Sequence, residues 1–261
     1  MAVLAASAVT LCGFIVTPAA GGASDLLSRL SRLGLAGDKL TGGSPSGRPA
    51  GSVAAVGALF TTSNGKLNSH FCTASVVHSP RGDLAITAAH CVTGVQAPVA
   101  FVPGYLNGKI PYGVWRVAHV YTDQAWQSSQ SQDDDVAFLA LDNPGQGVPI
   151  EDITGAEQLG TGWSTRAYTQ VFGYPDTSDQ PLRCANWTKP FSVTQLEFDC
   201  GGYTDGTSGG PFLVNVDKGT EQGTVVGVIG GYQQGGNTPD VSYSAYLGAD
   251  IQKLYAQATS G

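Results

Sequence analysis

Short apolar runs, each ended by turn-forming residues, recur along the chain from residue 52 onward. Glycine, proline, serine and asparagine separate the runs, and Asn64-Gly65 is a dipeptide that tight hairpin turns favour. Many short strands with this punctuation predict a β-barrel or a β-sandwich. The expected strands span residues 53–60, 71–77, 84–87, 99–102, 114–121, 136–141, 166–172, 194–198, 211–216 and 224–229.

Composition agrees with a β-rich protein of one large domain or two small ones. The chain has 261 residues, of which 36 are glycine and only 13% are charged. Few charges and many glycines favour a turn-rich β protein over a long helical one. Near the end, Ile251, Leu254 and Tyr255 recur at i, i+3, i+4, which predicts a helix over about 248–258.

The charge balance excludes two classes of partner. The formal net charge is −7, and the chain contains no run of lysine or arginine. A nucleic-acid binder or a protein held on anionic lipid needs a basic patch. We therefore expect no nucleic-acid partner and no stable association with a membrane surface once any leader is removed.

The first residues have the character of an export signal. Residues 1–20 carry no charge, and the small residues around 18–23 suit cleavage by a signal peptidase. We expect a signal peptide over 1–23 and a secreted, extracellular protein. A membrane anchor is the alternative, because a basic segment is missing at the start and about 20 apolar residues are enough to cross a bilayer.

Residues 24–51 are expected to precede the folded domain. Leucines at helical spacing predict a short helix over 24–40, and 41–51 is rich in glycine, serine and proline, as linkers are. The segment is either a propeptide, removed near Arg48 or earlier, or an N-terminal arm that is kept. Sequencing the N-terminus of the exported protein distinguishes the two, since an intact arm excludes the propeptide.

Five cysteines point to disulfides in an exported chain. Cys12 lies in the expected signal, which leaves Cys72, Cys91, Cys184 and Cys200. Four cysteines allow three pairings, and the sequential pairing, 72 with 91 and 184 with 200, closes one local loop in each half. Zinc is the alternative role, but the chain has no C-x2-C or H-x3-H spacing.

Three segments carry residue types suited to nucleophilic catalysis. His90 lies in Thr-Ala-Ala-His-Cys at 87–91, Asp135 directly precedes an apolar strand, and Ser208 lies in Gly-Thr-Ser-Gly-Gly-Pro at 206–211. A serine hydroxyl becomes a strong nucleophile only when a base takes its proton, and histidine suits that task near neutral pH. A buried carboxylate holds the imidazole in one tautomer.

The glycine-rich turn is also suited to stabilising negative charge. Developing charge on a substrate oxygen needs preorganised donors, commonly backbone amides. We expect the amides of Gly206 and Ser208 to supply them, with Gly209 and Gly210 keeping side chains away from the substrate.

These segments resemble those of the chymotrypsin family of serine peptidases, in its bacterial secreted form. The histidine segment is unchanged from the family pattern, and the serine segment differs from Gly-Asp-Ser-Gly-Gly-Pro at one position. The resemblance covers about 52–258 and is nearest to the glutamyl-endopeptidase-like branch. It implies an all-β fold of two antiparallel six-stranded barrels, about 52–150 and 160–247, with the active site in the cleft between them, and a Cys72–Cys91 disulfide.

The one departure is Thr207, where many members have an aspartate. In those members the aspartate pairs with the new N-terminus after activation cleavage and shapes the oxyanion hole. Thr207 cannot form that ion pair. We therefore expect the hole of this protein to form without insertion of an N-terminus.

Specificity is weakly encoded in the sequence. By the family pattern, Gly202 floors the primary specificity pocket, and Gly230, Gly231 and Tyr232 form the strand beside the bound peptide. An uncharged floor gives no support for cleavage after arginine or lysine, although Asp199 and Asp205 lie close enough in sequence to intrude. No histidine follows His119, so glutamyl specificity is not expected. We expect a small or apolar side chain in the pocket.

Together these features predict a monomeric, secreted serine endopeptidase that acts on proteins or peptides through an acyl-enzyme. The mechanism needs no cofactor, and no metal site is expected. One alternative is a secreted binding protein that keeps the peptidase fold without turnover. Another is an esterase of the α/β-hydrolase type, because Gly206-Thr207-Ser208-Gly209-Gly210 matches G-x-S-x-G, but the order His90, Asp135, Ser208 opposes it.

Overall fold

A computed structural model describes residues 44–260 of the chain. The expected signal peptide over 1–23, the expected helix over 24–40 and the start of the expected linker lie outside the described residues. In the part that is described, no helix is both long enough and apolar enough to cross a membrane.

The first half forms a closed six-stranded antiparallel barrel, as expected. Its strands follow the order β2-β3-β4-β7-β6-β5 around the barrel. The hairpin between the first two strands turns at Asn64 and Gly65, whose φ angles of 50° and 74° are those that Asn-Gly readily adopts. The strands are β2 (Val56–Ser63), β3 (Lys66–Val77), β4 (Leu84–Thr87), β5 (Val99–Pro103), β6 (Trp115–Thr122) and β7 (Ala137–Asp142).

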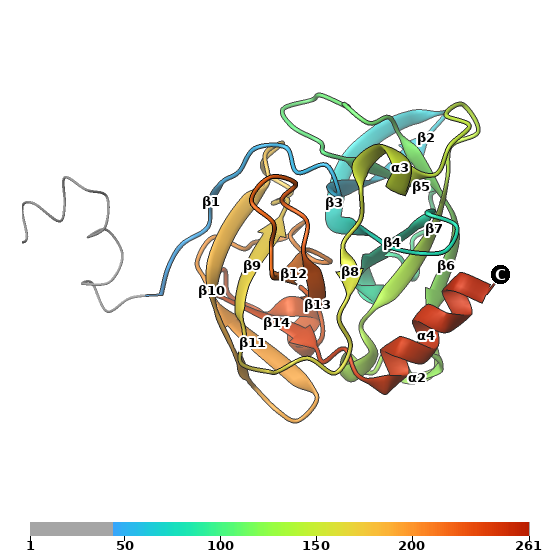
Figure 1. The fold of residues 1–261 in the computed structure, drawn as a ribbon. Coiled ribbons are helices and arrows are strands. Elements are labelled where there is room, and N and C mark those ends of the chain that lie inside the picture. Colours follow the sequence, from blue (N-terminus) through green and yellow to red (C-terminus); the bar gives the residue numbers. More distant parts are fainter. Residues whose placement is uncertain (1–43, 261) are drawn as a thin grey trace, which may run out of the picture. The chain divides into compact units, whose positions relative to one another are not determined.

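The second half contains six further antiparallel strands, in the order β14-β11-β10-β9-β12-β13. The two ends of this path approach each other where Gly230 N donates to Tyr243 O at 2.9 Å. Figure 1 shows this half beside the first barrel. The strands are β9 (Tyr168–Gly173), β10 (Leu182–Pro190), β11 (Gln195–Asp199), β12 (Pro211–Val214), β13 (Thr224–Val228) and β14 (Val241–Ala245).

Two short strands extend the second sheet beyond the six that we expected. β8 (Gln158–Leu159) pairs in parallel with β13, and β1 (Arg48–Pro49) pairs antiparallel with β10. The sheet therefore has eight strands, and one of its pairings is parallel. Both additions come from chain segments that enter or connect the barrels, and neither is long enough to produce an alternating apolar pattern.

A C-terminal helix closes the described chain, as the spacing of its apolar residues predicts. α4 (Ala249–Ser260) lies beside β6 and β7 of the first barrel (Figure 1). Ile251 and Leu254 are buried, and the Tyr255 ring packs edge-on against Phe138. The other helical turns are η1 (Ala89–Cys91), α2 (Gln124–Ser129), η2 (Gln132–Asp134), α3 (Ile150–Thr154) and η3 (Tyr232–Gly235).

The segment just before the first barrel is bound to the second barrel rather than forming a free linker. Gly47 N donates to Gly201 O at 2.7 Å, and Gly201 N donates to Pro45 O at 2.8 Å. Ala50 exchanges two further bonds with the connection between β9 and β10. The compact unit that holds both barrels begins at Ser44 and includes these contacts.

We predict that these contacts contribute to stability. A variant that begins at Ser44 should unfold like the longer protein, whereas one that begins at Gly51 should lose roughly 2–6 kcal/mol of unfolding free energy. The reason is that four hydrogen bonds are lost, each of which contributes about 0.5–1.5 kcal/mol. Urea unfolding followed by circular dichroism measures the difference, and equal stabilities of the two variants would contradict the prediction.

Candidate active site

The candidate base and its acid are brought together by two paired strands. His90 lies in η1, directly after β4, and Asp135 lies directly before β7. Because β4 and β7 are antiparallel neighbours, the end of one strand meets the start of the other. His90 Nδ1 lies 2.7 Å from Asp135 Oδ2, and His90 N donates to Asp135 Oδ1 at 2.9 Å.

Asp135 is fully buried, and both of its oxygens are satisfied. Besides the two contacts with His90, Oδ2 accepts a bond of 2.9 Å from Gly231 N in the second barrel. A buried carboxylate is stable only when donors surround it. With the Nδ1 proton directed at the carboxylate, Nε2 is the nitrogen left to accept a proton. Asp133, two residues away, is exposed.

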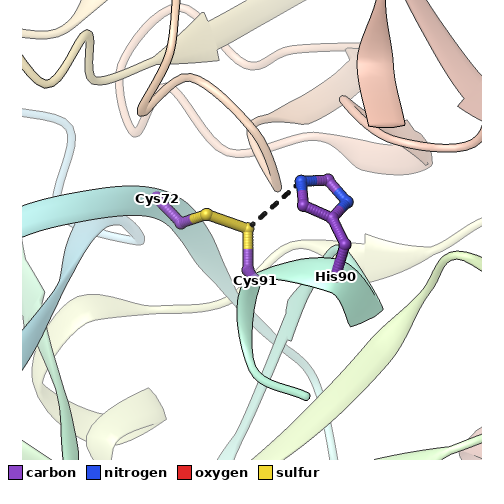
Figure 2. Close-up of side chains that lie close together, drawn as sticks. All are labelled: Cys72, His90 and Cys91. Atoms are coloured by element: carbon purple, nitrogen blue, oxygen red, sulfur yellow. Dashed lines mark hydrogen bonds between the residues drawn. A yellow bond between two sulfur atoms is a disulfide. The ribbon is translucent and has the colours of Figure 1, made fainter. Parts of the chain in front are cut away.

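A disulfide fixes the turn that carries His90. Figure 2 shows the imidazole beside the bond between Cys72 on β3 and Cys91, with Nε2 3.8 Å from Cys91 Sγ. These three residues lie close enough to hold a metal ion, but sulfurs joined in a disulfide are not the thiolates that bind metals. The other disulfide, Cys184–Cys200, joins β10 to the end of β11. The sequential pairing is thus the one formed.

Ser208 lies in a tight turn between β11 and β12. Glycines flank the turn, and Gly206 and Gly209 have φ angles of 89° and 80°, which side chains rarely tolerate. A Cβ on Gly209 would overlap Thr73 O. Strand β12 begins three residues after Ser208, where an α/β-hydrolase would have a helix, so the structure excludes the esterase alternative.

The amides of Gly206 and Ser208 are free to bind an anion. Throughout residues 44–260, neither N–H donates to an internal acceptor. The preceding carbonyls are both engaged, because Asp205 O accepts from Asp176 N at 2.8 Å and Thr207 O accepts from Gly210 N at 3.0 Å. In a planar trans peptide the N–H points opposite to the C=O. Each engaged carbonyl therefore fixes the direction of the amide that follows it.

One cavity of about 690 Å³ brings the candidate residues together. His90, Gly206 and Ser208 all line it. Within residues 44–260, Ser208 Oγ does not form a hydrogen bond with His90 Nε2. Such bonds are often long before substrate binds and shorten in the Michaelis complex.

Gly202, expected at the floor of the specificity pocket, and Gly230, Gly231 and Tyr232, expected beside the bound peptide, do not line this cavity themselves. Their sequence neighbours Tyr203, Ile229 and Gln233 do line it. The roles expected for the four residues stay predictions. Gly202 is exposed, and Gly230 and Gly231 lie against Asp135, where a Cβ on Gly230 would be 3.0 Å from Oδ2. Gly230 and Gly231 thus make room for the buried carboxylate, a role that the sequence pattern did not reveal.

The cavity walls come instead from residues that sequence analysis missed. Tyr203 lines the cavity, and burial raises the pKa of its hydroxyl, which donates to Val171 O at 2.7 Å. Gln233 and Gln234 also line it and have φ angles of 52° and 55°. Consecutive left-handed residues other than glycine are uncommon and often occur at functional sites. In the sequence, the only feature that could have indicated this loop is the pair of glycines on each side of it.

Of the two acids expected near the pocket, only one reaches the cavity. Asp205 lines it, one residue before Gly206. Asp199 is held elsewhere, because its Oδ2 forms an ion pair of 2.8 Å with Lys189 Nζ.

Two β-barrels with this histidine and serine on one cavity, and with the aspartate buried behind the histidine, form the arrangement of a chymotrypsin-like serine peptidase. Residues 43–247 match the family described as Trypsin, and the chain belongs to that family. It is a serine endopeptidase. A comparison with curated proteins finds no match.

Solved structures agree with the family. The protease Anisep from Arthrobacter nicotinovorans is 25% identical with a TM-score of 0.71, over 82% of this chain and 100% of its own. The thermostable serine protease AL20, from an extremophilic microorganism, is 26% identical with a TM-score of 0.67, over 80% and 98%. A Glu endopeptidase shares the fold at 15% identity and a TM-score of 0.64, over 84% and 99%.

The close packing around Gly206 predicts that an added side chain destabilises the protein. Gly206→Ala should destabilise the protein by about 1–3 kcal/mol more than Gly65→Ala. Both changes force a side chain into a positive φ, but only the Cβ at 206 would overlap backbone, at Asp176 N and 2.6 Å from Tyr174 O. Urea unfolding of the two variants measures the difference. Equal losses would mean that the turn accommodates the methyl group without cost.

Proposed function

We propose that Ser208, His90 and Asp135 are the catalytic triad of a secreted serine endopeptidase. The observation that carries the proposal is the 2.7 Å contact between His90 Nδ1 and the fully buried Asp135, with His90 and Ser208 on one cavity. Asp135 keeps the imidazole in the tautomer that leaves Nε2 free as a base. The alternative is a binding protein without catalytic activity. Loss of a triad residue would favour it, and this chain has all three residues.

The proposed reaction has two halves. Ser208 Oγ attacks the scissile carbonyl while its proton passes to His90 Nε2, and the resulting oxyanion is held by the amides of Gly206 and Ser208. His90 then gives the proton to the leaving amine as the peptide bond breaks, which leaves an acyl-enzyme. Water, activated by the same histidine, attacks the ester, releases the acid and restores the serine.

The oxyanion hole is proposed to be preformed without an ion pair at residue 207. Thr207 is buried, and its hydroxyl donates to Thr204 O at 2.7 Å, so the side chain is satisfied within the turn. No charge is buried there that would need an N-terminus as its partner. Activity should accordingly be the same for proteins that begin at different residues upstream of Ser44.

The proposal also covers export of the protein and cleavage of its N-terminal segment. Disulfides persist in oxidising compartments, which supports secretion with a signal peptide over 1–23. Because residues 45–50 are bound to the second barrel, any propeptide cleavage is proposed to fall within 24–43. The proposed substrates are proteins or peptides, and the proposed enzyme is a monomer that needs no cofactor.

A labelling experiment tests the triad. A fluorophosphonate probe should label the folded wild type and fail to label Ser208→Ala. Asp135→Asn should lower kcat by about 10⁴-fold, because the amide favours the wrong imidazole tautomer. Asp134→Asn, a matched change at the neighbouring acid, should leave kcat within a few-fold. A folded wild type that resists the probe would contradict the triad and favour the binding protein without catalytic activity.

The position of Asp205 predicts a specificity. We propose that the pocket accepts small or apolar side chains and disfavours glutamate, because a second carboxylate beside Asp205 is repelled. Asp205→Asn should raise kcat/KM for glutamyl over alanyl substrates about 5-fold, since two such charges repel by about 1 kcal/mol in water. Asp199→Asn is the control and should leave the ratio unchanged. A peptide library cleaved chiefly after glutamate or arginine would contradict the proposal.

A further inference from the structure

The turn that carries Ser208 is held by the first barrel. Thr207 is neutral and cannot fix this turn through an ion pair. The backbones of Gly206 and Ser208 are nevertheless fixed in this protein. The contacts responsible come from β3, more than a hundred residues earlier in the chain.

Thr73 makes two hydrogen bonds to this turn and one to the end of β9. Its backbone N donates to Ser208 O at 2.7 Å. Its hydroxyl donates to Gly206 O at 3.0 Å and accepts from Tyr174 N, at the end of β9, at 2.8 Å. Thr73 is fully buried, so water does not compete for these bonds.

Thr73 is itself rigidly placed. Its carbonyl accepts a bond of 2.7 Å from Thr87 Oγ1 on β4, and the preceding residue, Cys72, is joined to Cys91. The strand, the disulfide and this bond therefore restrain the residue on both sides. Thr87 in turn lies three residues before His90, so the same part of the first barrel holds both the base and the turn of the nucleophile.

The bonds act on the two peptide groups that flank Gly206. The peptide before it is held through Asp205 O and Asp176 N, and the peptide after it is held through Gly206 O and the Thr73 hydroxyl. Gly206 has a φ of 89°, in a region where glycine has broad freedom to rotate. Restraint on both sides is what keeps its N–H in one direction.

We propose that the Thr73 hydroxyl is a positioning residue for the reaction, holding the Gly206 and Ser208 amides in the geometry that stabilises the oxyanion. The inference rests on the proposed function. It assigns to a neutral hydroxyl of the first barrel the task of holding a turn that has no ion pair at residue 207. The hydroxyl does not touch the substrate and acts only through the turn.

Thr73→Val tests the hydroxyl, because valine has nearly the same shape but neither donates nor accepts. We expect kcat to fall about 10- to 100-fold with KM within about 3-fold, since outright removal of one oxyanion donor costs about 10²–10³ in kcat. Thr73→Ser keeps the hydroxyl and should restore kcat to within about 3-fold of wild type. Thr73→Ala replaces the valine variant if circular dichroism shows that the latter does not fold.

Thr188 supplies a matched control. It is nearly as buried, and its hydroxyl likewise accepts from one backbone amide, Ala167 N at 3.0 Å. The hydroxyl donates to Thr165 O at 3.0 Å, with a longer contact of 3.3 Å to Ala167 O. It lies on β10 and makes no bond to the Ser208 turn. Thr188→Val should lower the melting temperature as Thr73→Val does and leave kcat unchanged.

Two further readouts separate positioning from a general loss of stability. A peptide aldehyde places an oxygen in the oxyanion hole, whereas the matching peptide alcohol does not, so Thr73→Val should weaken binding of the aldehyde at least 10-fold more than that of the alcohol. The acid limb of the kcat/KM profile should not move, because the contact between His90 and Asp135 is intact.

The outcomes distinguish this inference from the proposed function. A folded wild type that neither turns over peptides nor reacts with the probe overturns both. An active wild type, with Thr73→Val equal to Thr188→Val in kcat and in the aldehyde-to-alcohol ratio, overturns only the role of Thr73. A low kcat in the serine variant, equal to that of the valine variant, also overturns it.

Discussion

The buried carboxylate of Asp135 is the interaction on which the site depends. Leaving a charge in the interior without donors costs several kcal/mol, so three N–H groups must converge on it. Two of these belong to His90 and one belongs to Gly231 of the second barrel. One charge therefore sets the orientation of the imidazole and also joins the two halves of the protein.

A second connection between the barrels runs through Thr73. The base comes from the first barrel and the proposed nucleophile from the second. Their relative position therefore depends on how rigidly the two barrels are joined. Asp135 restrains that junction on the side of His90, and Thr73 restrains it on the side of Ser208. Because both contacts are buried hydrogen bonds, their geometry is insulated from solvent.

Sequence patterns predicted the elements that form short, continuously buried apolar runs. The runs at 84–87 and 224–229 became strands with nearly the expected bounds, whereas β10 and β14 were missed. β10 is rich in half-exposed polar residues, and β14 buries serines where a pattern search expects apolar side chains. Hydrogen-bonded neighbours, rather than hydrophobicity, determine those two strands. Spacing alone did not predict which residues line the cavity, because loop conformation decides which side chains reach it.

Local features of this protein could be read from its sequence alone: most of the barrel strands, the Asn-Gly hairpin, the C-terminal helix and the three segments that carry His90, Asp135 and Ser208. These depend on residues close together in the chain, where propensity and periodicity act. Only the tertiary structure decided which residues line the cavity, that the segment before the barrel is bound, and that Thr73 holds the turn of Ser208. Those contacts join residues more than a hundred positions apart, and no local pattern encodes a hydrogen bond between them.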